Sequence, residues 1–185
     1  MIRGLFRLGL LGLGGSWLID RGLANRPGAD GLRLPIVSEV DIDAPIEAVW
    51  DAIADIERQP EWMHDLKAVR VLTGLPVGVG TRAIGTVRIL GISVEDPIAI
   101  TEFDPPSRYA IEHQGLFEGT GVIELTMRGN ETHVRWTEIL VPPILPHLGA
   151  IIQRPILGAV FQADLEHLRD LVESGGIRAV TDSDT

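Results

Sequence analysis

The stretch 37–63, VSEVDIDAPIEAVWDAIADIERQPEWM, most constrains how this chain can fold, because it places a strand, a helix and a tryptophan-bearing turn in immediate succession. Alternating apolar residues predict a strand that ends before Asp43, whose carboxylate we expect to cap the following helix. Pro45 suits the first positions of that helix. Apolar residues then recur at helical spacing and give one buried stripe: Ile46, Val49, Trp50, Ile53 and Ala54.

Six further strands are predicted after Trp62, separated by glycine, proline and asparagine turn signals that favour an antiparallel meander. They are Leu66–Thr73, Thr81–Leu90, Ile92–Phe103, Arg108–Gln114, Gly119–Arg128 and Thr132–Val141. Alternation assigns their faces. In the fifth of these strands we expect Gly121, Ile123, Leu125 and Met127 to face the core. In the sixth, the side that carries Trp136 is the expected interior, which places Glu138 inward.

A long amphipathic helix is predicted from Pro146 to Ser174, with apolar residues mostly three or four positions apart. Pro155 removes one backbone hydrogen bond and should kink or restart this helix. We therefore expect the straight part to run from about Ile156 to Glu173 and to end at Gly175 and Gly176.

In this order the segments resemble the polyketide cyclase/dehydrase branch of the START-like (SRPBCC) superfamily, most clearly in DAPIEAVWDAIADIERQPEWM. The resemblance covers roughly Ile36 to Ser174. It implies an α+β helix-grip fold, in which a curved antiparallel sheet wraps around a long C-terminal helix. In that superfamily the gap between helix and sheet serves as a cavity for hydrophobic molecules.

The length of 185 residues and a hydrophobic content of 45% suit one domain with a substantial core. We expect an apolar segment and linker over 1–35, the ligand-binding domain over 36–174 and a disordered tail over 175–185. A net charge of −10, with Lys67 as the single lysine, argues against nucleic acid as a partner. The absence of cysteine excludes disulfides and thiolate chemistry.

The N-terminal segment has Arg3 and Arg7 before an uncharged run from Leu8 to Ile19. That run is shorter than the roughly 20 residues that cross a bilayer as a helix. Membrane contact through residues 1–19 is one interpretation. The alternatives are a terminal helix that docks on the domain or on a second copy in a homodimer, and a signal peptide, although no small-residue cleavage site follows. Localisation is thus expected to be membrane-associated or cytoplasmic, with export as the alternative.

The sequence contains no metal-ligand, phosphate-loop or nucleophile motif, so we expect no metal and no cofactor. Glu138 is the sharpest candidate for chemistry, because an inward carboxylate could act as a base or hold a ligand hydroxyl. A solvent-wetted position at the rim is its alternative. Tyr109 and His113 alternate with Ile111 and should share the inner face, where His113 could equally be a hydrogen-bonded core histidine.

The apolar ligand-binding candidates are less distinct individually, because a lining residue and a core residue have the same periodicity. By the resemblance, Trp62 and Met63 lie in a loop that lines the mouth of the cavity. The inner candidates are Trp136, Leu157, Val160 and Phe161.

Three functions remain open on these patterns. The lack of a nucleophile motif, metal set or acid/base pair favours a protein that binds or transports a lipid, polyketide or quinone-like molecule. A polyketide cyclase or dehydratase would instead use Glu138, His113 and Tyr109 to move protons. A protein-interaction module would have an empty interior and an exposed apolar patch.

Overall fold

The computed structural model describes residues 16–22, 35–74, 76–89, 91–141 and 146–176. Residues 16–22 are helical and are followed, after a gap, by a single α+β unit. Its elements are β1 (Ile36–Ile42), α2 (Ile46–Ala54), the 3-10 helix η2 (Gln59–Glu61), β2 (Leu66–Val71), β3 (Arg82–Ile89), β4 (Ile92–Asp104), β5 (Arg108–Gln114), β6 (Glu118–Arg128), β7 (Glu131–Val141) and α3 (Pro146–Glu173).

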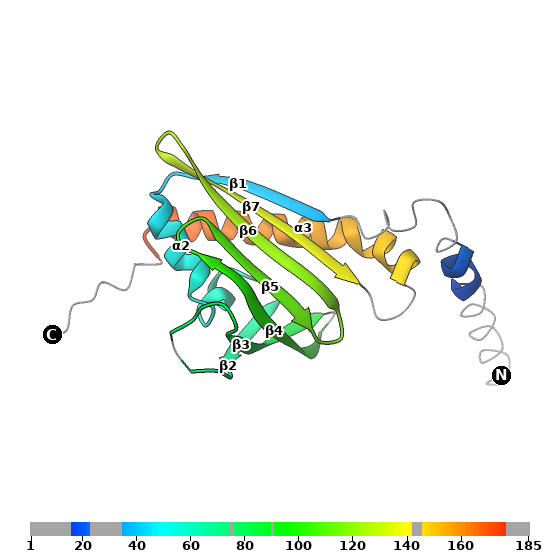
Figure 1. Cartoon of the computed structure of the whole chain (residues 1–185). Helices are drawn as coiled ribbons and strands as arrows, with labels where there is room; N and C mark the ends of the chain where they lie inside the picture. Colours follow the sequence, from blue (N-terminus) through cyan, green and yellow to red (C-terminus); the bar gives the residue numbers. More distant parts are fainter. Residues whose placement is uncertain (1–15, 23–34, 75, 90, 142–145, 177–185) are drawn as a thin grey trace.

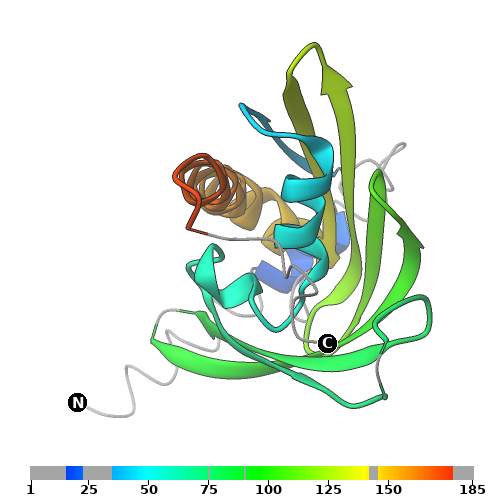
Figure 2. The same ribbon diagram turned by 90° about the vertical axis from the view of Figure 1, so that its left-hand side faces the viewer.

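The seven strands form one antiparallel sheet in the order β1-β7-β6-β5-β4-β3-β2. Strands β2 to β7 follow one another as the predicted meander, and β1 pairs with β7 at the far edge. The sheet curves around α3 and α2, both of which lie on its concave side (Figures 1 and 2). The predicted helix-grip fold is therefore confirmed.

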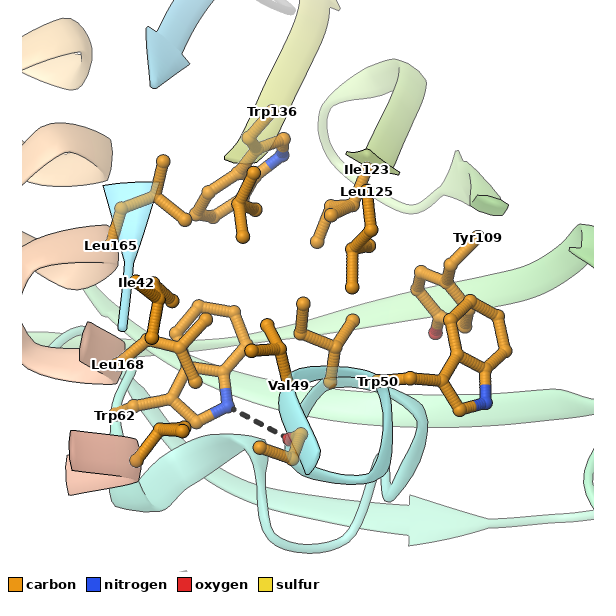
Figure 3. Close-up of a cluster of buried hydrophobic side chains, with 14 of the residues drawn as sticks. Ile42, Val49, Trp50, Trp62, Tyr109, Ile123, Leu125, Trp136, Leu165 and Leu168 are labelled. Atoms are coloured by element: carbon orange, nitrogen blue, oxygen red, sulfur yellow. Dashed lines mark hydrogen bonds between the residues drawn. The ribbon is translucent and has the colours of Figure 1, made fainter. Parts of the chain in front are cut away.

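The hydrophobic core fills the end of the molecule next to α2 (Figure 3). Trp62 is fully buried there; its indole N–H donates to the carbonyl of Ala52 at 3.3 Å, and its ring meets Trp136 edge-on at 6.1 Å. Leu165 and Leu168 of α3 are also fully buried. At this end, the concave face and the C-terminal half of α3 are closely packed.

The predicted cap of the first helix is wrong. Helix α2 begins at Ile46, and no side chain in the described region caps it; the carbonyl of Pro45 accepts the amide hydrogens of Ala48 and Val49. Asp43 lies too far before the first turn. Its own amide donates to Glu173 Oε1 at 3.0 Å, which ties the start of α2 to the end of α3.

Helix α3 is continuous through Pro155, so of the kink or restart predicted at that proline, the restart does not occur. Its C-terminus is as expected: Gly175 has φ +70°, and the amides of Gly175 and Gly176 donate to Val172 and Leu171. The predicted tail thus begins with residues that close the helix, while 177–185 lie outside the described residues. Gln162 of α3 bonds both the amide and the carbonyl of Glu39, which covers part of the free edge of β1.

Alternation predicts the inner face of β6 and β7 with one error. Ile123, Leu125, Val134 and Trp136 are buried as expected, whereas Met127 is 43% exposed. Met127 lies near the turn that joins the two strands. Among the described residues, no helix has the length and hydrophobicity needed to cross a membrane.

Candidate functional site

The inner face carries a polar cluster formed by Asp96 of β4, His113 of β5 and Glu138 of β7. The His113 ring bridges the two carboxylates: Nδ1 lies 2.6 Å from Asp96 Oδ2, and Nε2 lies 2.9 Å from Glu138 Oε1. The second oxygen of Glu138 accepts the indole N–H of Trp136 at 2.8 Å. The sheet thus holds a hydrogen-bonded row that crosses four of its strands.

Glycines on β6 allow this contact. His113 and Glu138 belong to strands that lie on either side of β6, roughly 9.5 Å apart in backbone position. In between, β6 presents Gly119 opposite His113 and Gly121 opposite Glu138. A Cβ atom on Gly121 would lie only 2.5 Å from Glu138 Oε2. The two side chains therefore meet across β6, which has no side chain on its inner face at Gly119 and Gly121.

Burial and charge determine the protonation of His113. Burial by itself lowers the pKa of His113, but hydrogen bonds and attraction from Asp96 and Glu138 outweigh it and raise the pKa from 6.5 to about 10. The ring is therefore a cation at neutral pH, and both of its N–H groups donate. Glu138 is only 2% exposed, which confirms its inward position and rules out the solvent-wetted rim.

Solvent reaches the other end of the cluster. The side chains of Asp96 and His113 are 19% and 14% exposed. Asp96 Oδ1 has no hydrogen-bond partner among the described residues and is covered by Gly115, whose Cβ position would lie 2.9 Å from it. A small molecule arriving from solvent would therefore meet only the exposed fractions of the Asp96 and His113 side chains.

Tyr109 does not join the cluster. It faces inward on β5 as predicted, but it lies four residues from His113, about 13 Å along the strand. Its hydroxyl is buried without a hydrogen bond to the described residues, and burial raises the pKa of Tyr109 above its ordinary value. The nearby Gln59 side chain lowers the pKa of Tyr109 but only partly offsets the effect of burial. The side-chain amide of Gln59 donates to the carbonyl of Ile53 and not to the Tyr109 hydroxyl.

The six apolar residues that were predicted to line a ligand cavity differ in how deeply they are buried. The predicted position of Trp62 at the mouth is wrong, since the side chain is fully buried in the core; Met63 is half-buried against that core. Trp136 is buried and stacks on Phe161 at 4.5 Å between ring centroids. Leu157, Val160 and Phe161 of α3 are only half-buried, unlike Leu165 and Leu168 one to three turns further along.

Burial along α3 therefore increases from Leu157 towards Leu168. The half-buried residues include Phe161, whose partner Trp136 donates to Glu138 of the polar cluster. Two open hollows are present in the described region: one of about 460 Å³ on the outer side of β5 to β7, which His113 of the cluster also lines, and one of about 440 Å³ between β1 and α3.

Asp96 is the cluster residue that the sequence analysis missed. The signal was present, because Asp96 alternates with Ile98 and Ile100, both buried on the inner face of β4. Within the described ranges, no three histidine or carboxylate side chains are arranged to hold a metal ion.

Comparison with known proteins gives one family match. The sequence matches the family described as "Polyketide cyclase / dehydrase and lipid transport" over residues 34–173. No curated protein matches the chain.

Several solved structures have a similar fold. A protein of Thermus thermophilus aligns with a TM-score of 0.65 and 21% identity over 77% of this chain and 99% of that one. A protein of Deinococcus radiodurans has a TM-score of 0.59 and 20% identity, over 76% of this chain and 98% of that one. A protein of Geobacillus kaustophilus has a TM-score of 0.61 and 15% identity, over 77% of this chain and 97% of that one. At these identities the likeness concerns the fold alone.

Proposed function

Because the chain belongs to the polyketide cyclase / dehydrase and lipid transport family, we propose that it binds a hydrophobic small molecule, a lipid, polyketide or quinone-like compound, inside the curved sheet. The apolar part of this ligand lies against Leu157, Val160 and Phe161 of α3. Its polar part lies at the Asp96–His113–Glu138 cluster.

One observation supports this proposal above the others: a charged network lies on the inner face beside half-buried apolar side chains. Burying charged groups costs free energy unless they are paired, and buried ionisable groups with strongly shifted pKa values cluster at functional sites. A purely structural core would gain more from apolar residues of similar volume.

The test is native mass spectrometry of the full chain purified without detergent, followed by identification of any molecule released on unfolding. A recurring apolar molecule bound in a one-to-one ratio is the expected result. A chain that is always empty, and that takes up no lipid, polyketide or quinone added to it, would contradict the proposal and favour a protein-interaction module.

A pair of neighbouring variants locates the bound molecule. Leu157→Trp places a larger side chain on the face of α3 that continues to Phe161 and Leu165, so it should displace the ligand. Ile156→Trp is the matched control, because Ile156 is 61% exposed on the same helix. Equal ligand retention by both variants would show that the ligand binds elsewhere.

The second candidate function is proton-transfer catalysis on the bound molecule, as in a cyclase or dehydratase. It is favoured by the two hydrogen bonds that join His113 to Asp96 and Glu138, since such a network can accept and return a proton. Glu138→Gln should then stop the conversion of bound substrate, seen as loss of water or ring closure, while affinity changes little. Conversion at an unchanged rate would exclude Glu138 as the base. Tyr109 lies too far from the cluster to act in the same step.

A further inference from the structure

The cluster has no free hydrogen-bond donor. Both ring nitrogens of His113 are engaged by carboxylates, and the indole N–H of Trp136 is engaged by Glu138. The carboxylate oxygens keep spare acceptor capacity, because each has two lone pairs; Asp96 Oδ1 is buried beside Gly115 and has no partner among the described residues. Any polar group that approaches the cluster meets acceptors only.

The cluster also carries a net negative charge. Two carboxylates and one imidazole share a single extra proton, so the formal charge is −1 whether that proton lies on His113 or on either acid. Since Glu138 is almost fully buried, this charge is poorly screened by water. An anionic group placed beside Asp96 would be repelled and would lose its own hydration.

No basic side chain of the described strands compensates this charge from the inner face. Six of the seven lysine and arginine residues on the strands are exposed, and Arg108, the seventh, pairs with Glu102 and Glu124 on the outer face. Arg154 of α3 lines the hollow beside β1, where its Nε is buried without a hydrogen-bond partner among the described residues. Across the described inner wall of the sheet, the positive charge is therefore that of His113, which is already shared between two acids.

We propose that the molecule bound here presents a hydrogen-bond donor to Asp96, in the form of a hydroxyl or amine group, and that amphiphiles with a carboxylate or phosphate head are rejected. The inference rests on the proposed function and narrows it: hydroxylated polyketides, sterol-like alcohols and amines fit the site, whereas fatty acids and phospholipids do not. A ligand that can only accept hydrogen bonds also lacks a partner in the cluster.

The test compares four probes that share one alkyl chain and differ in the polar group: dodecanol, dodecylamine, dodecyl methyl ether and dodecanoate. Binding to the full chain is measured by isothermal titration at neutral pH, below the micelle concentration of each probe. We expect the alcohol and the amine to bind about tenfold or more tightly than the ether and the acid, since an unmet or repelled polar contact costs at least ~1.4 kcal/mol.

Two variants assign the selectivity to Asp96. Asp96→Asn removes the negative charge and supplies a hydrogen-bond donor. The affinity for dodecanoate should therefore rise relative to the affinity for dodecanol. Glu95→Gln is the matched control, because Glu95 is the exposed neighbour of Asp96 on β4 and points to the outer face. The head-group order in the wild-type chain is decisive even if Asp96→Asn fails to fold.

The outcomes separate this inference from the function on which it rests. If dodecanoate or dodecyl methyl ether binds as tightly as dodecanol, the inference about the polar group is wrong. The proposed binding of a hydrophobic molecule would still stand. If none of the four probes binds, and no apolar molecule accompanies the purified chain, the proposed function fails and the inference fails with it.

Discussion

Gly121 is the residue on which the polar cluster depends most directly. Its missing side chain leaves the space that the Glu138 carboxylate occupies, since an added Cβ would come within 2.5 Å of Oε2. We predict that Gly121→Ala displaces Glu138 and leaves the Trp136 and His113 donors without their acceptor. The expected loss is ~1–3 kcal/mol in the free energy of unfolding, measured by urea denaturation.

Gly158→Ala provides the control for that substitution. Gly158 lies in α3, and a Cβ there would meet Ile36 Cγ2 at an ordinary 3.7 Å. Because alanine is favoured over glycine within a helix, Gly158→Ala should stabilise the chain by up to ~1 kcal/mol. If Gly121→Ala also stabilised the chain, the close approach of Glu138 to β6 would not exist.

His113 should make stability depend on pH in the alkaline range. Its pKa is raised to about 10 in the folded chain, above the ordinary 6.5 of an unfolded one. The network's contribution is therefore complete below about pH 6.5 and is lost as the pH rises towards 10. Urea denaturation between about pH 6.5 and about pH 9.5 should show this decline in the wild type.

The matched variant is His113→Gln, which cannot titrate and should show a flatter profile over the same range. Keeping the scan below about pH 10 avoids a contribution from Tyr109. Because the pKa of Tyr109 is raised in the folded chain, this residue affects stability only above about pH 10, where tyrosine ionises in the unfolded chain. Parallel pH profiles for the two proteins would mean that the ring is not held as a cation. The His113 ring signals in an NMR titration provide an independent reading of the same pKa.

At the scale of whole strands and helices, local sequence patterns predict much of the architecture. Period-two alternation placed Glu138, His113 and Tyr109 on the inner face correctly, because one side of each strand is buried. The pattern cannot predict which of these residues meet. That depends on the register across β6, where Gly119 and Gly121 let residues from two non-neighbouring strands come together.

The errors at this scale have local physical causes. Asp43 looked like a helix cap because its residue type is favoured there, but the helix begins only after Pro45 and the aspartate amide bonds Glu173 instead. Trp62 looked like a mouth residue because of its place after the first helix. Its burial comes from long-range contacts with Trp136, which no local pattern shows.

Asp164 ties α3 to the loop that follows η2. This aspartate is 3% exposed, and its Oδ1 accepts both the backbone amide of His64 at 2.9 Å and the ring Nδ1 at 2.7 Å. Asp164→Ala would leave that amide without its partner, so we predict a loss of ~1–3 kcal/mol. Hydrogen exchange should accelerate at His64 before it does so in the sheet.

Asp170→Ala is the control for this contact, because Asp170 is an exposed residue on the same helix that pairs with its neighbour Arg169. An exposed pair of this kind contributes little to stability. Equal losses for the two variants would indicate a general effect on α3 and not a specific contact with the loop.

The molecule as a whole has two different ends. Next to α2, tryptophans and α3 leucines fill the interior; at the opposite end the wall is polar and α3 is half-buried. The described helical residues 16–22 lie beyond this second end (Figure 1), and Trp17, Leu18 and Ile19 are 53%, 65% and 57% exposed. We predict that these exposed apolar residues contact a membrane surface.

The formal charge also differs between the N-terminal segment and the rest of the chain. Residues 1–35 contain five arginines and two aspartates, a formal charge of +3, so the remaining residues carry −13 of the total of −10. We predict that the N-terminal segment attaches the chain to anionic membranes while the acidic domain stays clear of them, because basic residues near an anionic bilayer each contribute roughly 1 kcal/mol. Flotation with phosphatidylglycerol-containing vesicles should therefore recover the chain, and vesicles of phosphatidylcholine alone should recover less.

Replacing Arg3 and Arg7 together by glutamate tests the origin of that attachment. The double variant should lose most of its flotation, and added salt should weaken the wild type in the same direction, since a screened attraction fades beyond a Debye length of about 10 Å at 0.1 M salt. The control applies an equal charge change to Arg82 and Arg88, exposed residues of β3 in the domain. If both double variants float equally well, attachment arises from the apolar residues alone; if the wild type does not float, the N-terminal segment is not a membrane anchor.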